Sequence, residues 1–127
     1  MKKKIKVANI LEEGFLGGPQ KRVVFTSKYL SQFVTNKVII PKNNSSEFKN
    51  LLKENKIDYQ ELHINKLSKN LPQLLKYIFT FVYEILVLRK YFINNQFDLI
   101  HISGGVWQIK GLIAGKLSNK KIIWQLN

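Results

Sequence analysis

Strand-length apolar runs alternate with segments of helical periodicity along the whole chain, and this alternation constrains the fold more than any other feature. The runs lie at residues 5–11, 36–41, 58–64, 97–103 and 121–126. Helices are expected between them, at about 20–33, after Asn44, at about 71–94 and at about 108–117. Because the strands are apolar with little alternation, the pattern predicts an α/β fold: a Rossmann-like parallel sheet with helices on both faces.

Length and composition bound the kind of protein. With 127 residues, the chain is expected to be a single Rossmann-like domain spanning 1–127. A formal net charge of +13 implies anionic partners, which include nucleic acid, anionic lipid and phosphorylated small molecules. The absence of cysteine excludes disulfides and thiolate metal sites or nucleophiles. The charged start resembles a signal peptide, but Lys6, Asn9, Glu12 and Glu13 interrupt its apolar run, so we interpret it as a strand.

Two Gly-Gly pairs follow predicted strands, Gly17 and Gly18 after the first and Gly104 and Gly105 after the fourth. Ligands of such sheets bind beyond the carboxyl ends of the strands, so both pairs are expected at that edge. Gly17 and Gly18 allow a positive φ and a close ligand approach, and a helix beginning near Pro19 would offer free N–H groups to a phosphate. A simple chain turn is the alternative interpretation.

The common cofactor signatures are missing from this loop. It has neither the G-x-G-x-x-G dinucleotide fingerprint nor the lysine-serine pair of a P-loop, which argues against NAD or ATP. We therefore expect no cofactor and no metal site. For the helix after residue 41, Asn44 and Glu47 have the spacing of a capping box with asparagine as the cap.

Taken together, the motifs resemble the N-terminal domain of GT-B glycosyltransferases of retaining family 4. The segments "GGPQKRV", "FDLIHISGG" and "KIIWQLN" occur in the order of the family's G-G-x-x-x-V, D-[IV]-[IV]-H-x-H/S and V-x-x-x-H-D motifs. The resemblance spans essentially the whole chain. It implies an acceptor-binding domain that faces a nucleotide-sugar-binding domain across a cleft, with a glycan or lipid-linked acceptor. It also implies that Gly17 and Gly18 approach the donor diphosphate.

The substrate-binding residues implied by this resemblance are Gly17, Gly18, His101, Gly104, Gly105 and Asn127. Asn127 stands where the family has a histidine, and an amide binds a sugar hydroxyl but is no base, so no catalytic residue is assigned. His101 matches the family's first strand histidine, although a single strand histidine is more often a packing residue. We interpret Glu12 and Glu13 as a solvated loop edge, with contact to an acceptor hydroxyl as the alternative.

The family's C-terminal donor domain has no counterpart in these 127 residues, so we expect the chain alone to transfer no sugar. Two other functions stay open: a basic, non-catalytic nucleic-acid-binding module, and half of a GT-B-type sugar-nucleotide epimerase. Against the first, no stretch interleaves aromatic and basic residues as common RNA-binding motifs do, so no nucleic-acid partner is expected. This half of the architecture does not separate the epimerase from the transferase.

The helix expected at 71–94 has a wider apolar arc than one sheet contact requires. Its polar residues Gln73, Lys76, Thr80 and Glu84 share one narrow stripe, and the arc is made of Phe79, Phe81, Val82, Tyr83, Ile85 and Leu86. Thr80 and Glu84 keep the apolar run below the ~20 residues of a membrane span. A second packing partner, shallow insertion into an anionic bilayer surface and a deeply buried helix stay open. We expect a cytoplasmic protein that can bind peripherally to the inner face of the membrane.

Overall fold

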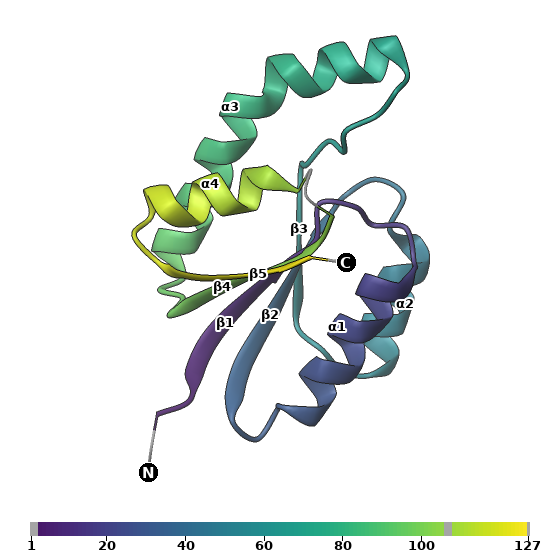
Figure 1. Cartoon of the computed structure of the whole chain (residues 1–127). Helices are drawn as coiled ribbons and strands as arrows, with labels where there is room; N and C mark the ends of the chain where they lie inside the picture. The colour runs from purple at the N-terminus through teal and green to yellow at the C-terminus, as the bar shows by residue number, and fades with distance from the viewer. Residues whose placement is uncertain (1–2, 106–107, 127) are drawn as a thin grey trace.

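The computed structural model describes residues 3–105 and 108–126 and has the predicted Rossmann-like architecture (Figure 1). Within these residues, the strands form one parallel sheet in the order β3-β2-β1-β4-β5. The strands are β1 (Ile5–Ile10), β2 (Val34–Pro41), β3 (Tyr59–Leu62), β4 (Leu99–Gly104) and β5 (Lys121–Leu126). The helices are α1 (Gly18–Tyr29), α2 (Ser46–Glu54), α3 (Leu71–Asn94) and α4 (Ile109–Leu117). The expected α/β fold is therefore confirmed.

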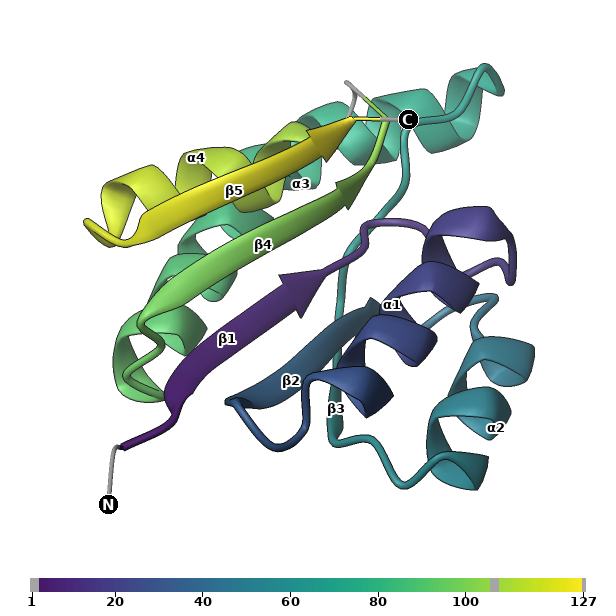
Figure 2. The same cartoon turned by 60° about the horizontal axis from the view of Figure 1, so that its bottom comes forward.

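The helices lie on opposite faces of the sheet (Figure 2), and an apolar layer holds them on each face. Successive side chains of a strand point to opposite faces, so the apolar residues of β2 serve both layers. Val38 and Ile40 pack with Phe48 and Leu52 of α2, and the same layer includes α1. Ile39 belongs to the other layer, which α3 and α4 cover with residues that include Ile85, Leu88, Phe92 and Ala114.

Two helix boundaries differ from those expected from sequence. α1 begins at Gly18 and ends at Tyr29, because Phe33 and Val34 donate backbone hydrogen bonds to Leu30 and close a turn into β2. The expected capping box at Asn44 is wrong. Asn44 has a left-handed φ of 58° and Ser45 is the residue before α2, with its hydroxyl bound to a backbone oxygen of β2 instead of capping the helix.

The edge strand β5 is less covered than its apolar sequence predicts. None of its residues is buried, and Ile123 and Leu126 are 51% and 54% exposed. Among the described residues β5 pairs with β4 alone, so it is an edge strand. Burial on both faces therefore applies to the inner strands and not to this one.

Candidate functional site

The loops after β1 and β4 leave the sheet at the same edge, because these neighbouring strands are parallel. The chain passes from β1 to α1 on one face and from β4 to α4 on the other, so strand order reverses between them. Gly17 and Gly18 lie at the start of α1, and Gly104 ends β4 with Gly105 following it. The predicted placement of both glycine pairs at one edge is confirmed.

The start of α1 is held in place by a side chain of its own first turn. Gln20 accepts a hydrogen bond from the Gly17 N–H at 3.1 Å and donates one to the backbone oxygen of Glu13 at 2.8 Å. A Cβ added to Gly18 would meet no atom within 4 Å, so space is open beside this residue. The first N–H groups of a helix have no acceptor within the helix, which makes this open end suitable for an anion.

The conformational argument for Gly17 and Gly18 is wrong. Gly17 has an extended φ of −141° and Gly18 is the first residue of α1, so neither has the positive φ expected. Among the described glycines it is Gly104 that has a positive φ, of 135°, and a Cβ there would lie 1.8 Å from Nε2 of Gln108. Close packing of Gln108 against β4 therefore requires the glycine at 104.

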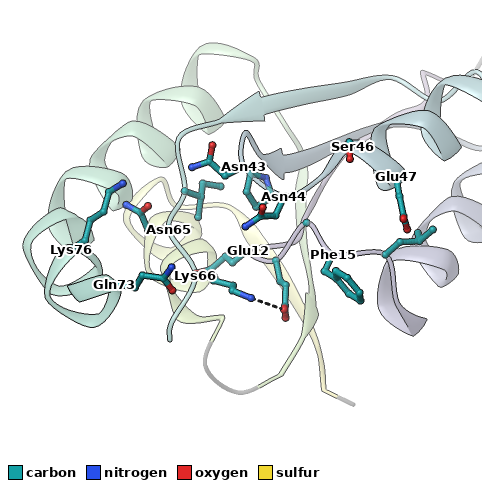
Figure 3. A pocket seen from close by; sticks show the side chains of 15 residues that line it. Glu12, Phe15, Asn43, Asn44, Ser46, Glu47, Asn65, Lys66, Gln73 and Lys76 are labelled. Carbon is teal, nitrogen blue, oxygen red and sulfur yellow. Dashed lines mark hydrogen bonds and ion pairs between the residues drawn. The ribbon is translucent and has the colours of Figure 1, made fainter. Parts of the chain in front are cut away.

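A cavity of about 420 Å³ opens at the same edge of the sheet (Figure 3). Its wall comes from the loop after β1, the loop before α2, the segment after β3 and the first turns of α3. The lining residues are Glu12, Glu13, Gly14, Phe15, Leu16, Pro41, Asn43, Asn44, Ser46, Glu47, Ile64, Asn65, Lys66, Gln73 and Lys76. We call this cavity the edge pocket.

Neutral amides form the largest single class of polar side chain in the lining of the edge pocket. Asn43, Asn44, Asn65 and Gln73 each offer donors and acceptors, and the pocket also has carboxylates, lysines and one aromatic ring, Phe15 (Figure 3). Such a mixture can hydrogen-bond several hydroxyl groups of a small polar ligand while an apolar surface packs against its carbon skeleton. The chemistry suits a carbohydrate.

A buried ion pair lies behind the pocket wall. Lys110 Nζ of α4 lies 3.2 Å from Glu84 Oε2 of α3, and the two side chains are 0% and 2% exposed. Lys110 also donates to the backbone oxygen of Asn65 and lies 4.1 Å from the ring centroid of Tyr77. Glu84 accepts from the Asn65 N–H and from the hydroxyl of Thr80. The segment after β3 is thereby fixed to both helices.

Glu12 adds a second carboxyl group to this buried cluster. Its residue is 3% exposed, and its Oε2 accepts a hydrogen bond from the Gly111 N–H in the first turn of α4 at 3.3 Å. Burial raises the pKa of Glu12 to about 7, although the Lys110 charge and the Gly111 hydrogen bond oppose this shift. Burial also lowers the pKa of Lys110. The lining of the edge pocket therefore includes a carboxyl group, that of Glu12, with a pKa of about 7.

The solvated-edge interpretation thus holds for one of the two glutamates. Glu13 is partly exposed, with 41% of its side chain accessible, and it pairs with Lys66 at 3.5 Å across the pocket mouth. Glu12 is buried, so that interpretation is wrong for Glu12. Its backbone N–H donates to Oε1 of Gln108 at 3.0 Å, which ties the loop after β1 to the start of α4.

His101 is held within the sheet by neighbours on both sides. Its Nε2 lies 3.1 Å from Oε1 of Gln125 on β5, and its Nδ1 contacts the side-chain oxygen of Asn9 on β1. Burial lowers the pKa of His101, which favours the neutral ring. The packing interpretation accounts for these contacts. Two residues further along β4, the buried hydroxyl of Ser103 has no hydrogen-bond partner among the described residues.

Of the substrate-binding residues implied by the resemblance, Gly17, Gly18, His101, Gly104 and Gly105 do not line the edge pocket, although Gly17 and Gly18 directly follow its lining segment at 12–16. Glu12 and Glu13, for which an acceptor contact was the alternative interpretation, do line it. Asn127 lies outside the described residues. Sequence reasoning missed Asn43, Asn44 and Asn65, which come after β2 and β3. The signal was available, because polar residues just past these strands must lie at the same edge as the glycine pairs. Over the described residues, no group of His, Cys, Asp and Glu side chains is arranged to hold a metal ion.

Comparison with known proteins gives matches in fold but not in sequence. No family model and no curated protein sequence matches the chain. Among solved structures, a glycosyltransferase from Rickettsia africae matches with a TM-score of 0.72 and 18% identity over 97% of this chain and 30% of that protein. Anabaena HepE, solved with UDP and glucose, matches with a TM-score of 0.62 and 17% identity over 94% of this chain and 29% of that one.

A candidate UDP-N-acetylglucosamine 2-epimerase from Listeria monocytogenes also matches, with a TM-score of 0.63 and 13% identity over 97% of this chain and 31% of the other. These matches place the same parallel sheet in a glycosyltransferase, in a protein solved with UDP and glucose, and in a candidate UDP-N-acetylglucosamine 2-epimerase. The chain has the fold of one Rossmann-like domain of the GT-B architecture. This GT-B-type domain spans about a third of the length of the solved structures it matches.

Proposed function

We propose that the chain is the acceptor-side domain of a glycosyltransferase that uses a nucleotide sugar, and that the edge pocket takes a sugar of the acceptor. The observation that carries this proposal is the amide-rich lining of a pocket located at the carboxyl edge of the sheet. The sequence motifs favour a retaining enzyme of the family 4 type. The acceptor is a glycan or a lipid-linked sugar.

The position of the loop after β1 supports a second contact, with the donor diphosphate. Residues 14–16 line the edge pocket, and the next residues, Gly17 and Gly18, begin α1. The N–H groups and dipole of α1 favour an anion there by about 0.3–1 kcal/mol per charge at an exposed site. The exposed Lys21 in the next turn adds positive charge. Acceptor and diphosphate would thus meet on adjacent parts of one loop.

Transfer itself requires a second domain in this proposal. The leaving diphosphate must be neutralised and the anomeric carbon held about 3–3.5 Å from the acceptor oxygen. Both needs are met when groups from two walls of a closed cleft converge, and this domain supplies one wall. We therefore expect no sugar transfer by the chain alone.

The test is release of nucleoside diphosphate from a panel of sugar nucleotides, each with a panel of acceptors. The isolated chain and the chain joined to a C-terminal GT-B domain are compared. The proposal predicts release by the joined protein and none by the isolated chain. Robust turnover by the isolated chain would contradict it.

Gly18→Val tests the diphosphate contact in the joined protein. The branched side chain would enter the open space beside the start of α1, so a strong loss of activity is expected. Thr26→Val, on the exposed side of α1, is the matched control and should retain activity. Full activity in a folded Gly18→Val enzyme would exclude the phosphate contact.

An epimerase is the second candidate function, because the Listeria match has the same fold. An epimerase needs no acceptor, whereas a transferase does. Conversion of a nucleotide sugar to its epimer without any acceptor, and with no diphosphate release, would favour this candidate over transfer.

A further inference from the structure

The outward face of α3 is apolar over most of its length. Phe79 is 81% exposed, and the other exposed apolar side chains of this face are Leu71, Leu75, Ile78, Val82, Tyr83 and Leu86. We call these residues the α3 face. By length and composition, the helix is long and apolar enough to cross a membrane. Only 22% of its most apolar stretch is buried inside the domain. The interpretation of α3 as a deeply buried helix is therefore wrong.

The polar stripe of α3 faces the edge pocket and the buried ion pair, which leaves the α3 face on the outside. Gln73 and Lys76 line the edge pocket, Thr80 bonds to the side chain of Asn65 at 3.0 Å, and Glu84 pairs with Lys110. Rotating the helix to bury the α3 face would break these contacts and leave Glu84 and Lys110 buried without partners. The exposed face is thus a consequence of the polar contacts behind it.

The charges around the α3 face are of one sign. Outside the polar stripe, exposed basic residues lie beside or on the helix, namely Lys69, Arg89, Lys90 and Lys116. The acidic residue within α3 is Glu84, which is buried and paired, and α4 has no acidic residue. The face therefore combines an apolar centre with basic surroundings.

We propose that the α3 face docks on the surface of an anionic lipid bilayer, with α3 lying in the plane of the interface. Apolar side chains would enter the boundary between head groups and acyl chains while the lysines and arginine attract anionic head groups. The helix would not span the bilayer, since its polar stripe stays bound to the domain. A second copy of the chain is a poor partner for the α3 face, because the basic residues around the two faces would repel one another. This inference goes beyond the proposed function and does not depend on it.

Flotation of the purified chain with lipid vesicles tests the proposal. Vesicles of phosphatidylcholine alone are compared with vesicles that also contain phosphatidylglycerol. Binding is expected to the anionic vesicles and to fall as salt rises, because surface charges are screened beyond ~10 Å at 0.1 M ionic strength. Equal binding to both vesicles, or binding to neither, would overturn the proposal.

Paired phenylalanine variants locate the face that binds. Phe79→Ser removes the most exposed ring of the α3 face and should lower vesicle partitioning roughly tenfold or more. Phe25→Ser is the matched control, because Phe25 is 60% exposed on α1, on the other side of the sheet. It should leave partitioning unchanged. Equal losses in the two variants would contradict docking through α3. Phe81 is unsuitable as a probe, since its ring packs against Tyr77 with centroids 5.6 Å apart.

The lack of cysteine allows a direct readout at chosen positions. Val82→Cys and Thr26→Cys can each be labelled with a polarity-sensitive dye, the first on the α3 face and the second on the exposed side of α1. Anionic vesicles should shift the emission of the dye at position 82 to the blue and leave the dye at position 26 unchanged. A shift at position 82 that grows with protein concentration without lipid would instead identify a second copy as the occupant.

Discussion

At the scale of single residues, Gly104 and Glu12 each have an unusual conformation or environment. Gly104 has a φ that L-residues rarely adopt, and Gln108 packs where its Cβ would be. Glu12 is buried and exchanges its proton near neutral pH. Both residues contribute to the contacts that join the loop after β1 to the start of α4.

Gly104→Ala should destabilise the protein by about 1–3 kcal/mol from backbone conformation alone, with a further cost from displacing Gln108. Gly18→Ala is the matched glycine substitution, because a Cβ there meets no atom within 4 Å. It should change the free energy of unfolding by no more than about 0.5 kcal/mol. Urea denaturation of both variants measures the difference. Equal stability of the two would show that the conformation of Gly104 is not needed.

Glu12→Gln should change how stability depends on pH. The pKa of Glu12 rises from 4.5 to about 7 on folding, so between these values the folded state binds more protons than the unfolded state. The contribution of Glu12 to the free energy of unfolding is therefore at its maximum below about pH 4.5, and it is lost as the pH rises through about 7. The variant should not show this loss of stability. Between pH 4 and pH 8, its free energy of unfolding should therefore rise by on the order of 2–3 kcal/mol relative to that of the native protein.

Chemical denaturation across this pH range, together with NMR titration of the Glu12 carboxyl carbon, measures the effect. A carboxyl that titrates near its ordinary value, or parallel pH profiles for the two proteins, would contradict the assignment.

Sequence reasoning at this scale located residues better than it described their conformations. The two glycine pairs were predicted at the correct sheet edge, because that depends on strand order alone. Their φ values depend on Gln20 and Gln108, whose side chains pack through contacts that no local pattern encodes. In the same way, Glu12 resembles a loop residue until α4, 99 residues away along the chain, supplies the Gly111 N–H.

At the scale of elements, α3 has a polar stripe and an apolar arc, and its periodicity does not show which of them faces the domain. The polar stripe and the apolar arc are both visible in the sequence, because helical geometry is local. Which of them faces inward is decided by the contacts of Glu84 with Lys110 and of Thr80 with Asn65, which come from other elements.

Exposed and buried apolar residues of α3 should therefore respond differently to truncation. Phe79→Ser should change the free energy of unfolding by no more than about 0.5 kcal/mol, because the ring is 81% exposed. Leu88→Ala, at a residue 1% exposed, should cost about 2–5 kcal/mol. Urea denaturation in the absence of lipid provides the comparison. A large loss for Phe79→Ser would mean that the α3 face is covered in solution.

The ion pair between α3 and α4 should behave as a coupled unit. Lys110→Met leaves Glu84 buried without its cation and should cost about 3–5 kcal/mol. Adding Glu84→Met removes the unpaired charge, so the double variant should lose less stability than the sum of the two single variants. A double-mutant cycle measures this coupling, and strict additivity would contradict the pair.

At the scale of the whole molecule, the order of the strands makes the site. The alternation of apolar and helical segments predicts the parallel sheet and the edge at which the loops after β1 and β4 leave it. The edge pocket was not predicted, because segments from residue 12 to residue 76 form it and their separation in space depends on loop conformation and on the placement of α3. The weak burial of β5 follows from its position at the end of the sheet, which strand sequences do not reveal.

The central claim is that the edge pocket binds a sugar, and NMR titration of the isolated chain with a panel of mono- and disaccharides tests it most directly. At least one sugar should shift the backbone resonances of residues 12–16, 43–47 and 64–66, and Asn43→Ala should weaken that binding. Asn55→Ala, at a residue beyond the end of α2 and outside the edge pocket, should bind as the native chain does. Shifts confined to other surfaces, or an unchanged affinity in Asn43→Ala, would contradict the claim.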